Sequence, residues 1–139
     1  MTALIDTCVI VDTLQNRIPF SNDSNIIMFN CANNLIEGFV SAKSICDIYY
    51  LAHKNLHDNK KTKEIISKIC TLFNVVDTKT IDIKNAIISE INDFEDSVLI
   101  QTAVRLKVDC IVTRNIKDFK NSPIKVYSPT EFNKIMSNV

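Results

Sequence analysis

Acidic and amide side chains follow several short apolar runs of the sequence, each near the residue where the run stops. Asp6 follows residues 2–5, and Asn115 and Asp118 follow residues 110–113. The carboxyl ends of parallel strands share one edge of a sheet, so these side chains meet in one cleft if the runs are such strands. Crowded carboxylates repel one another unless a cation lies between them, and hard oxygen ligands favour Mg²⁺ or Mn²⁺ over zinc.

Two further acids occupy similar positions. Asp47 comes a few residues after the apolar run at 38–42, and Asp96 lies in the first turn of a helix predicted at residues 93–107. Its neighbour Glu95 ranks behind it, because consecutive residues of a helix point about 100° apart. The candidate catalytic residues are therefore Asp6, Asp47, Asp96, Asn115 and Asp118.

Each acid also has a purely structural explanation. An aspartate at the start of a helix can cap the free N–H groups of the first turn, which would account for Asp6, Asp93 or Asp96 taken singly. Capping explains less well why several acids follow apolar runs together. Four other aspartates lack this placement and are interpreted as solvated or capping residues: Asp12, Asp77, Asp82 and Asp109. We therefore expect Asp12→Asn to leave any activity within a few fold.

Apolar patterns of strand and helix alternate along the chain, as in α/β proteins. Strands are expected at residues 2–5, 38–42, 73–76 and 110–113, with an edge strand at 124–127. Helices are expected after Asp6, at residues 22–36, in a pair between residues 43 and 72, at 81–90, at 93–107 and from Pro129. The sequence predicts one α/β domain over residues 1–139, with a central parallel sheet of four to five strands flanked by helices.

Composition excludes several classes of protein. A chain of 139 residues, 46% hydrophobic, can bury one core, and its net charge of zero leaves nucleic-acid binding to a local patch. The densest positive charge runs from Lys54 to Lys68, either guiding RNA or forming a solvated helix face. No apolar run approaches the roughly 20 residues of a membrane span, and the opening residues lack a signal-peptide pattern. We expect a cytoplasmic protein with no membrane segment.

Glycine and cysteine contents exclude other sites. Dinucleotide-binding and Walker A loops need several glycines, and this chain has one. Gly38 is interpreted as the turn between a helix ending near Glu37 and the next strand. The five cysteines form no CxxC pair and are interpreted as small buried hydrophobic residues rather than zinc ligands or disulfides.

Three segments together resemble the PIN-domain family of metal-dependent ribonucleases, especially the small VapC-like toxins of toxin–antitoxin pairs. The opening L-I-D-T-C-V-I-V-D at residues 4–12 resembles the family's first strand and its aspartate. N-D-F-E-D-S-V-L-I at residues 92–100 and V-T-R-N-I-K-D-F at residues 112–119 resemble its closing half. The order and spacing of the three segments extend the resemblance over nearly the whole chain.

The resemblance implies roles for individual residues. Asp6, Asp96 and Asp118 match ligands of a Mg²⁺ or Mn²⁺ ion, with Asn115 beside them. Asp47 stands where VapC-like members usually carry a glutamate, and Asn115 is neutral where many relatives have an acid. The Asp47 side chain is one methylene shorter than that of glutamate, so we expect it to act through a bridging water rather than by direct contact with the ion. The neutral Asn115 lowers the charge available to hold a second ion, so we expect one firmly bound ion rather than two.

The resemblance also implies a reaction and partners. The reaction is hydrolysis of RNA phosphodiester bonds, leaving a 5′ phosphate and a 3′ hydroxyl, and the partners are an antitoxin and a second copy of the chain in a homodimer. Thr7, Thr113 and Arg114 are candidates to touch RNA or to support the ligands. For Thr113 and Arg114, a strand-end hydroxyl bond and a surface cation are the structural alternatives.

Two alternative functions remain. One is a PIN-like module that binds RNA or protein without cutting, which the departures at Asp47 and Asn115 would suit. The other is a receiver-like phosphoacceptor domain, which also places acids at strand ends. A receiver usually opens with paired acids and carries a late lysine, whereas this chain has Asp6 alone and Arg114.

Overall fold

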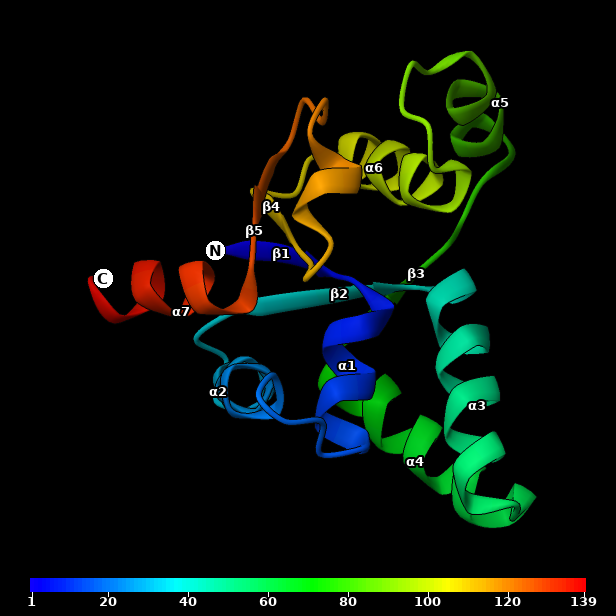
Figure 1. Cartoon of the computed structure of the whole chain (residues 1–139), viewed down its shortest axis with the longest axis vertical. Helices are drawn as coiled ribbons and strands as arrows, with labels where there is room; N and C mark the ends of the chain where they lie inside the picture. The colour runs from blue at the N-terminus through cyan, green and yellow to red at the C-terminus, as the bar shows by residue number, and fades with distance from the viewer.

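Five parallel strands form the central sheet of the computed structural model, which describes residues 1–139 (Figure 1). In sheet order they are β3 (Asn74–Val76), β2 (Glu37–Ser41), β1 (Thr2–Ile5), β4 (Cys110–Val112) and β5 (Lys125–Tyr127). Every neighbouring pair is parallel. The predicted α/β fold with a central parallel sheet is thus confirmed, including its edge strand.

The strand order places the change of direction beside β1. The chain runs outward from β1 through β2 to β3, then returns to β4 on the other side of β1 and continues to β5. Ligands of open α/β sheets bind where the order reverses, at the carboxyl ends of the strands. Receiver-like domains have the order 2-1-3-4-5 instead, so the observed order 3-2-1-4-5 excludes that alternative.

Helices cover both faces of the sheet (Figure 1). One face carries α1 (Thr7–Leu14), α2 (Ser21–Ala32), α3 (Ala42–Leu56) and α4 (Asn59–Leu72). The other carries α5 (Thr80–Ile88) and α6 (Phe94–Leu106). A short 3-10 helix, η1 (Ile116–Phe119), follows β4, and α7 (Pro129–Ser137) packs against α2. No helix combines the length and apolar character needed to cross a membrane.

The neighbouring strands β1 and β4 show why the core has two layers, one on each face of the sheet. Side chains alternate between the faces of a strand. Ala3 and Ile5 of β1 therefore join the cluster with α1 to α4 and α7, whereas Leu4 joins the cluster with α6 and η1. In β4, Ile111 shares the second cluster with Leu4. Continuous apolar sequence is needed because both faces are covered.

Gly38 does not form the turn predicted for it. The helix α2 ends at Ala32, and Asn34 takes the left-handed conformation with φ 57°. Gly38 is instead a buried residue of β2. A Cβ at this position would lie 2.7 Å from the Phe73 ring and 2.8 Å from the Cys31 sulfur. The glycine is needed for close packing of the strand, and asparagine, which tolerates positive φ, makes the turn.

Candidate active site

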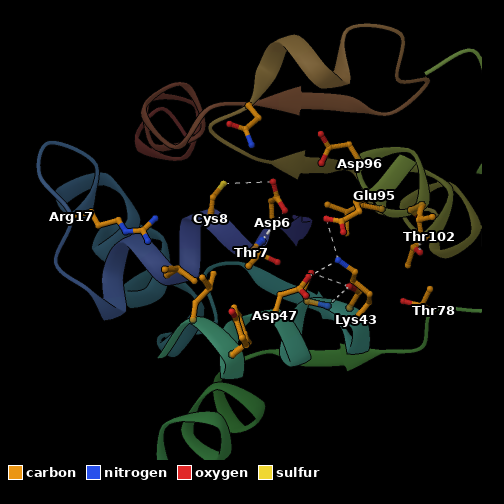
Figure 2. Close-up of a pocket in the computed structure, with 18 residues that line it drawn as sticks. Asp6, Thr7, Cys8, Arg17, Lys43, Asp47, Thr78, Glu95, Asp96 and Thr102 are labelled. Carbon is orange, nitrogen blue, oxygen red and sulfur yellow. Dashed lines mark hydrogen bonds and ion pairs between the residues drawn. The ribbon is translucent and has the colours of Figure 1, made fainter. Parts of the chain in front are cut away.

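A pocket of about 360 Å³ opens at the carboxyl end of the sheet (Figure 2). Asp6 follows β1, Ser41 ends β2 and Asn115 lies beyond β4, so three neighbouring strands deliver residues to it. The helices α1, α3 and α6 supply most of the other walls. Five of the predicted site residues line the pocket: Asp6, Thr7, Asp47, Asp96 and Asn115.

Strand register brings Asp6 against Thr113. Ile5 pairs with Val112, and the Asp6 N–H donates to the Val112 carbonyl at 3.0 Å. The Thr113 hydroxyl then donates to Asp6 Oδ2 at 2.7 Å, and the Thr7 N–H donates to Oδ1 at 2.8 Å. Asp6 is therefore both the cap of α1 and a pocket residue.

Burial and hydrogen bonding change the pKa of the Asp6 carboxylate in opposite directions. Burial raises its pKa, and the hydrogen bonds from Thr113 and Thr7 offset part of that rise. Thr113 itself is fully buried, so its hydroxyl orients Asp6 and also accepts from the Asn115 N–H at 3.0 Å. Of the two roles expected for Thr113, support of a candidate ligand agrees with its burial and contact with RNA does not.

Asp96 stands where the negative charges converge. Burial raises its pKa most, and the neighbouring carboxylates of Asp6, Asp93, Asp118 and Glu95 raise it further, to about 7. A carboxylate with such a pKa is only partly ionised at neutral pH and is stabilised by a nearby cation. The four surrounding acids make Asp96 the residue of the pocket that most needs one.

Three aspartates can surround an ion beside the pocket. Carboxylate oxygens of Asp93, Asp96 and Asp118 lie within 4.8 Å of one another. Asp93 begins α6 and accepts the Asp96 N–H at 3.0 Å, while Asp118 lies on η1. An all-carboxylate set fits a hard cation such as Mg²⁺ or Mn²⁺. Asp96 belongs both to this set, with Asp118, and to the pocket, with Asp6. It therefore lies between the other two predicted ligands.

Asp47 and Glu95 are joined by a lysine that sequence reasoning missed. The Lys43 ammonium lies 2.6 Å from Asp47 Oδ2 and 3.3 Å from Glu95 Oε2 (Figure 2). Asp47 is one helical turn after Lys43 on α3, whereas Glu95 comes from α6 across the pocket. The predicted second acid is thus present in the pocket but neutralised by a cation of the chain itself.

Comparison with known families identifies the chain. The sequence profile of the PIN domain matches residues 2–117, most of the chain. This protein belongs to the PIN domain family. The resemblance inferred from residues 4–12, 92–100 and 112–119 is thereby confirmed. No curated protein matches the sequence.

Solved structures share the fold at low sequence identity. A toxin–antitoxin complex from Klebsiella pneumoniae matches with a TM-score of 0.67 and 20% identity, covering 91% of this chain and 97% of its own. DNA-bound VapBC from Salmonella typhimurium gives 0.68 and 15%, covering 93% and 98%. FitAcB from Neisseria gonorrhoeae gives 0.68 and 18%, covering 92% and 98%. The likeness establishes the PIN fold over nearly the full length of each chain.

In this PIN domain Asp12 is neither solvated nor a cap, contrary to our expectation. Its carboxylate is fully buried and accepts two hydrogen bonds from Arg114, at 2.5 Å from Nε and 3.1 Å from Nη2. Arg17 lies 3.7 Å away, and the Arg114 guanidinium lies 4.0 Å from the centre of the Phe20 ring. Arg114 is thus an anchored cation rather than a free surface one, and Asp12 holds it.

Asp82 is a second correction. It is buried between α5 and α6, where Arg105 donates to both carboxylate oxygens at 2.9 Å and the Thr102 hydroxyl donates at 3.1 Å. It also accepts the Lys79 N–H at 2.9 Å, so capping is only part of its role. Asp77 is exposed, and Asp109 is an exposed acceptor for Thr2, as expected of them.

Asp12→Asn should destabilise the PIN domain by about 2 kcal/mol, because it removes the charge from a buried carboxylate that faces two arginines. Arg17 and Arg114 are partly exposed and can turn toward water, which keeps the loss below that of a fully buried pair. Urea unfolding measures the change. Asp77→Asn, at an exposed position, is the matched control and should change the free energy of unfolding by less than about 0.5 kcal/mol; equal effects would contradict the assignment.

The raised pKa of Asp96 should make stability fall with pH in a defined window. Its pKa is about 7 in the folded protein against an ordinary value of 3.8. Between these values the unfolded chain releases the proton and the folded protein keeps it, so rising pH favours unfolding. In chelator, the free energy of unfolding of wild type should fall relative to that of Asp96→Asn from about pH 4 to about pH 7, and level off above. A difference independent of pH would show that Asp96 ionises normally.

Proposed function

We propose that this PIN domain is a metal-dependent endoribonuclease that hydrolyses RNA phosphodiester bonds, leaving a 5′ phosphate and a 3′ hydroxyl. The observation that supports it most is the cluster of Asp93, Asp96 and Asp118, whose carboxylate oxygens lie within 4.8 Å of one another beside the pocket. A divalent cation is the simplest group that makes such a cluster favourable in its ionised form. Membership of the PIN domain family and the all-oxygen donor set point the same way.

In this proposal the chain's residues hold the ion and orient the RNA. Asp93, Asp96 and Asp118 hold Mg²⁺ or Mn²⁺, with Asp6 directed toward the same charge by Thr113 and Thr7. An ion held there would supply a water molecule of lowered pKa and positive charge to offset that of the phosphate. Asn115 lines the pocket as a neutral amide, which suits a role toward RNA better than one toward the ion.

Arg17 and Arg114 place positive charge near the acids, where the negatively charged RNA backbone would bind. Arg17 lines the pocket at the end opposite Lys43 (Figure 2). Asp12 holds Arg17 and Arg114 close together, so the pair carries one positive charge more than its shared carboxylate cancels. We assign both arginines to phosphates flanking the scissile bond, where contacts give affinity independent of base sequence.

RNA cleavage with and without metal tests the proposal. Purified protein should cut a mixture of fluorescent RNAs with Mn²⁺ and not with chelator. Asp6→Asn and Asp96→Asn should lower the rate about a hundredfold or more, because each removes a charge from the ion's surroundings without changing side-chain size. Asp77→Asn should cut at the wild-type rate.

Thermal melts measure metal binding separately from RNA cleavage. Mn²⁺ at a hundredfold excess over Kd should stabilise the wild type by about 2.7 kcal/mol, and Asp96→Asn should respond less. If the wild type binds Mn²⁺ and RNA but never cuts, the chain is a binding module. If the two proteins show equal metal-induced shifts, Asp96 is only a residue of the helix start.

We further propose that the protein is a homodimeric toxin paired with an antitoxin. Similar structures are described as toxin–antitoxin complexes, which supports this role by analogy of fold. Exposed apolar side chains on two helices offer surfaces for protein partners: Ile26 and Phe29 on α2, and Ile87 and Ile88 on α5. A partner arginine or lysine placed near Asp96 and Asp118 would replace the ion's charge and block the site.

The toxin role predicts a growth phenotype. Expression of the wild type in bacteria should arrest growth, Asp96→Asn should not, and co-expression of the small gene neighbouring it should restore growth. Colony counts and growth curves measure each outcome. A wild-type protein that cuts RNA in vitro but is harmless in cells would be a nuclease without the toxin role.

A further inference from the structure

Lys43 is an unusual residue for its place in the fold. It lies in the first turn of α3, directly after the carboxyl end of β2. The N-terminal turn of a helix carries partial positive charge and disfavours a lysine. The ammonium must therefore be stabilised by acids, and it lies against two, Asp47 and Glu95, inside the pocket.

The Lys43 contacts are more than a helix-surface pair. Asp47 is one turn away on the same helix, and such pairs form readily on exposed helices. Glu95 belongs to α6, on the other face of the sheet, so its contact bridges the pocket (Figure 2). Two acids from two different helices thus share one ammonium.

The charges divide the pocket and the aspartate cluster beside it into two parts. Asp93, Asp96 and Asp118 have no lysine or arginine within salt-bridge distance and can surround an ion. Asp47 and Glu95 are already paired with Lys43, so a second divalent ion beside them would have to displace an ammonium or be repelled by it. Two-ion nucleases use the second ion to stabilise charge on the phosphate oxygens.

We propose that Lys43 is a built-in cation that replaces a second metal ion: it limits the pocket to one divalent ion and supplies the second positive charge to the RNA phosphate. The ammonium is partly exposed, with its side chain 42% accessible, so an incoming phosphate oxygen can reach it. This inference rests on the proposed nuclease function for the phosphate contact, but its effect on metal binding does not require cleavage.

Mn²⁺ titration by calorimetry tests the metal part of the proposal in three variants. Wild type should bind about one ion per chain, and Lys43→Met should bind about two, because the freed carboxylates of Asp47 and Glu95 become ligands. Lys43→Arg keeps the charge and should remain at about one. Lys84→Met, at an exposed position of α5, is the matched control and should behave as wild type. The Lys43 pair is partly exposed and adds little stability, so the variants should fold.

RNA cleavage at a Mn²⁺ concentration that fills only the first site tests the phosphate part. There Lys43→Met should cut roughly a hundredfold more slowly than wild type, with Lys43→Arg in between and Lys84→Met unchanged. Two bound ions in the wild type, or no added Mn²⁺ site in Lys43→Met, would overturn the replacement of an ion. Full activity in Lys43→Met with only one ion bound would overturn the contact with phosphate. Absence of cleavage in every variant would refute the nuclease function, while the titration would still decide whether Lys43 excludes an ion.

Discussion

Repulsion between carboxylates is the constraint on which this site depends. The parallel sheet brings acids together at one edge, and burial makes their charges more costly still. The protein offsets the cost differently at each acid: with hydroxyl and backbone donors at Asp6, with an ammonium at Asp47, and with partial protonation at Asp96. Asp96 and its two aspartate neighbours have no lysine or arginine within salt-bridge distance, and that is where a cation has most to contribute.

The sequence predicted the strands of the sheet and several of the residues that lie at their carboxyl ends. Apolar runs bounded by polar residues located all five strands, and the rule that parallel strands share a carboxyl edge predicted that Asp6, Asp96 and Asn115 would face one pocket. Both uses of Asp6, as cap and as pocket residue, proved compatible because its two carboxylate oxygens bond to different donors.

Residues that the sequence could not place depend on contacts between distant segments. Asp12 has the same local pattern as a solvated helix residue, and only the position of Arg114 makes it a buried partner. Lys43 looks like half of an ordinary helix pair until Glu95 is brought across from α6. Asp93 is the helix cap that its sequence position indicates, and the position of Asp118 also makes it part of the aspartate cluster. In each case, the local sequence shows one partner of the contact, and the other partner comes from a distant segment of the chain.

The bond between Thr113 and Asp6 spans 107 residues, and Arg114 reaches back 102 residues to Asp12. Contacts of such sequence separation form only when the intervening chain is complete. A chain still attached to the ribosome, with its last strands inside the exit tunnel, has neither the oriented Asp6 nor the anchored arginine. The wide separation of its parts therefore delays assembly of the site until synthesis is nearly finished.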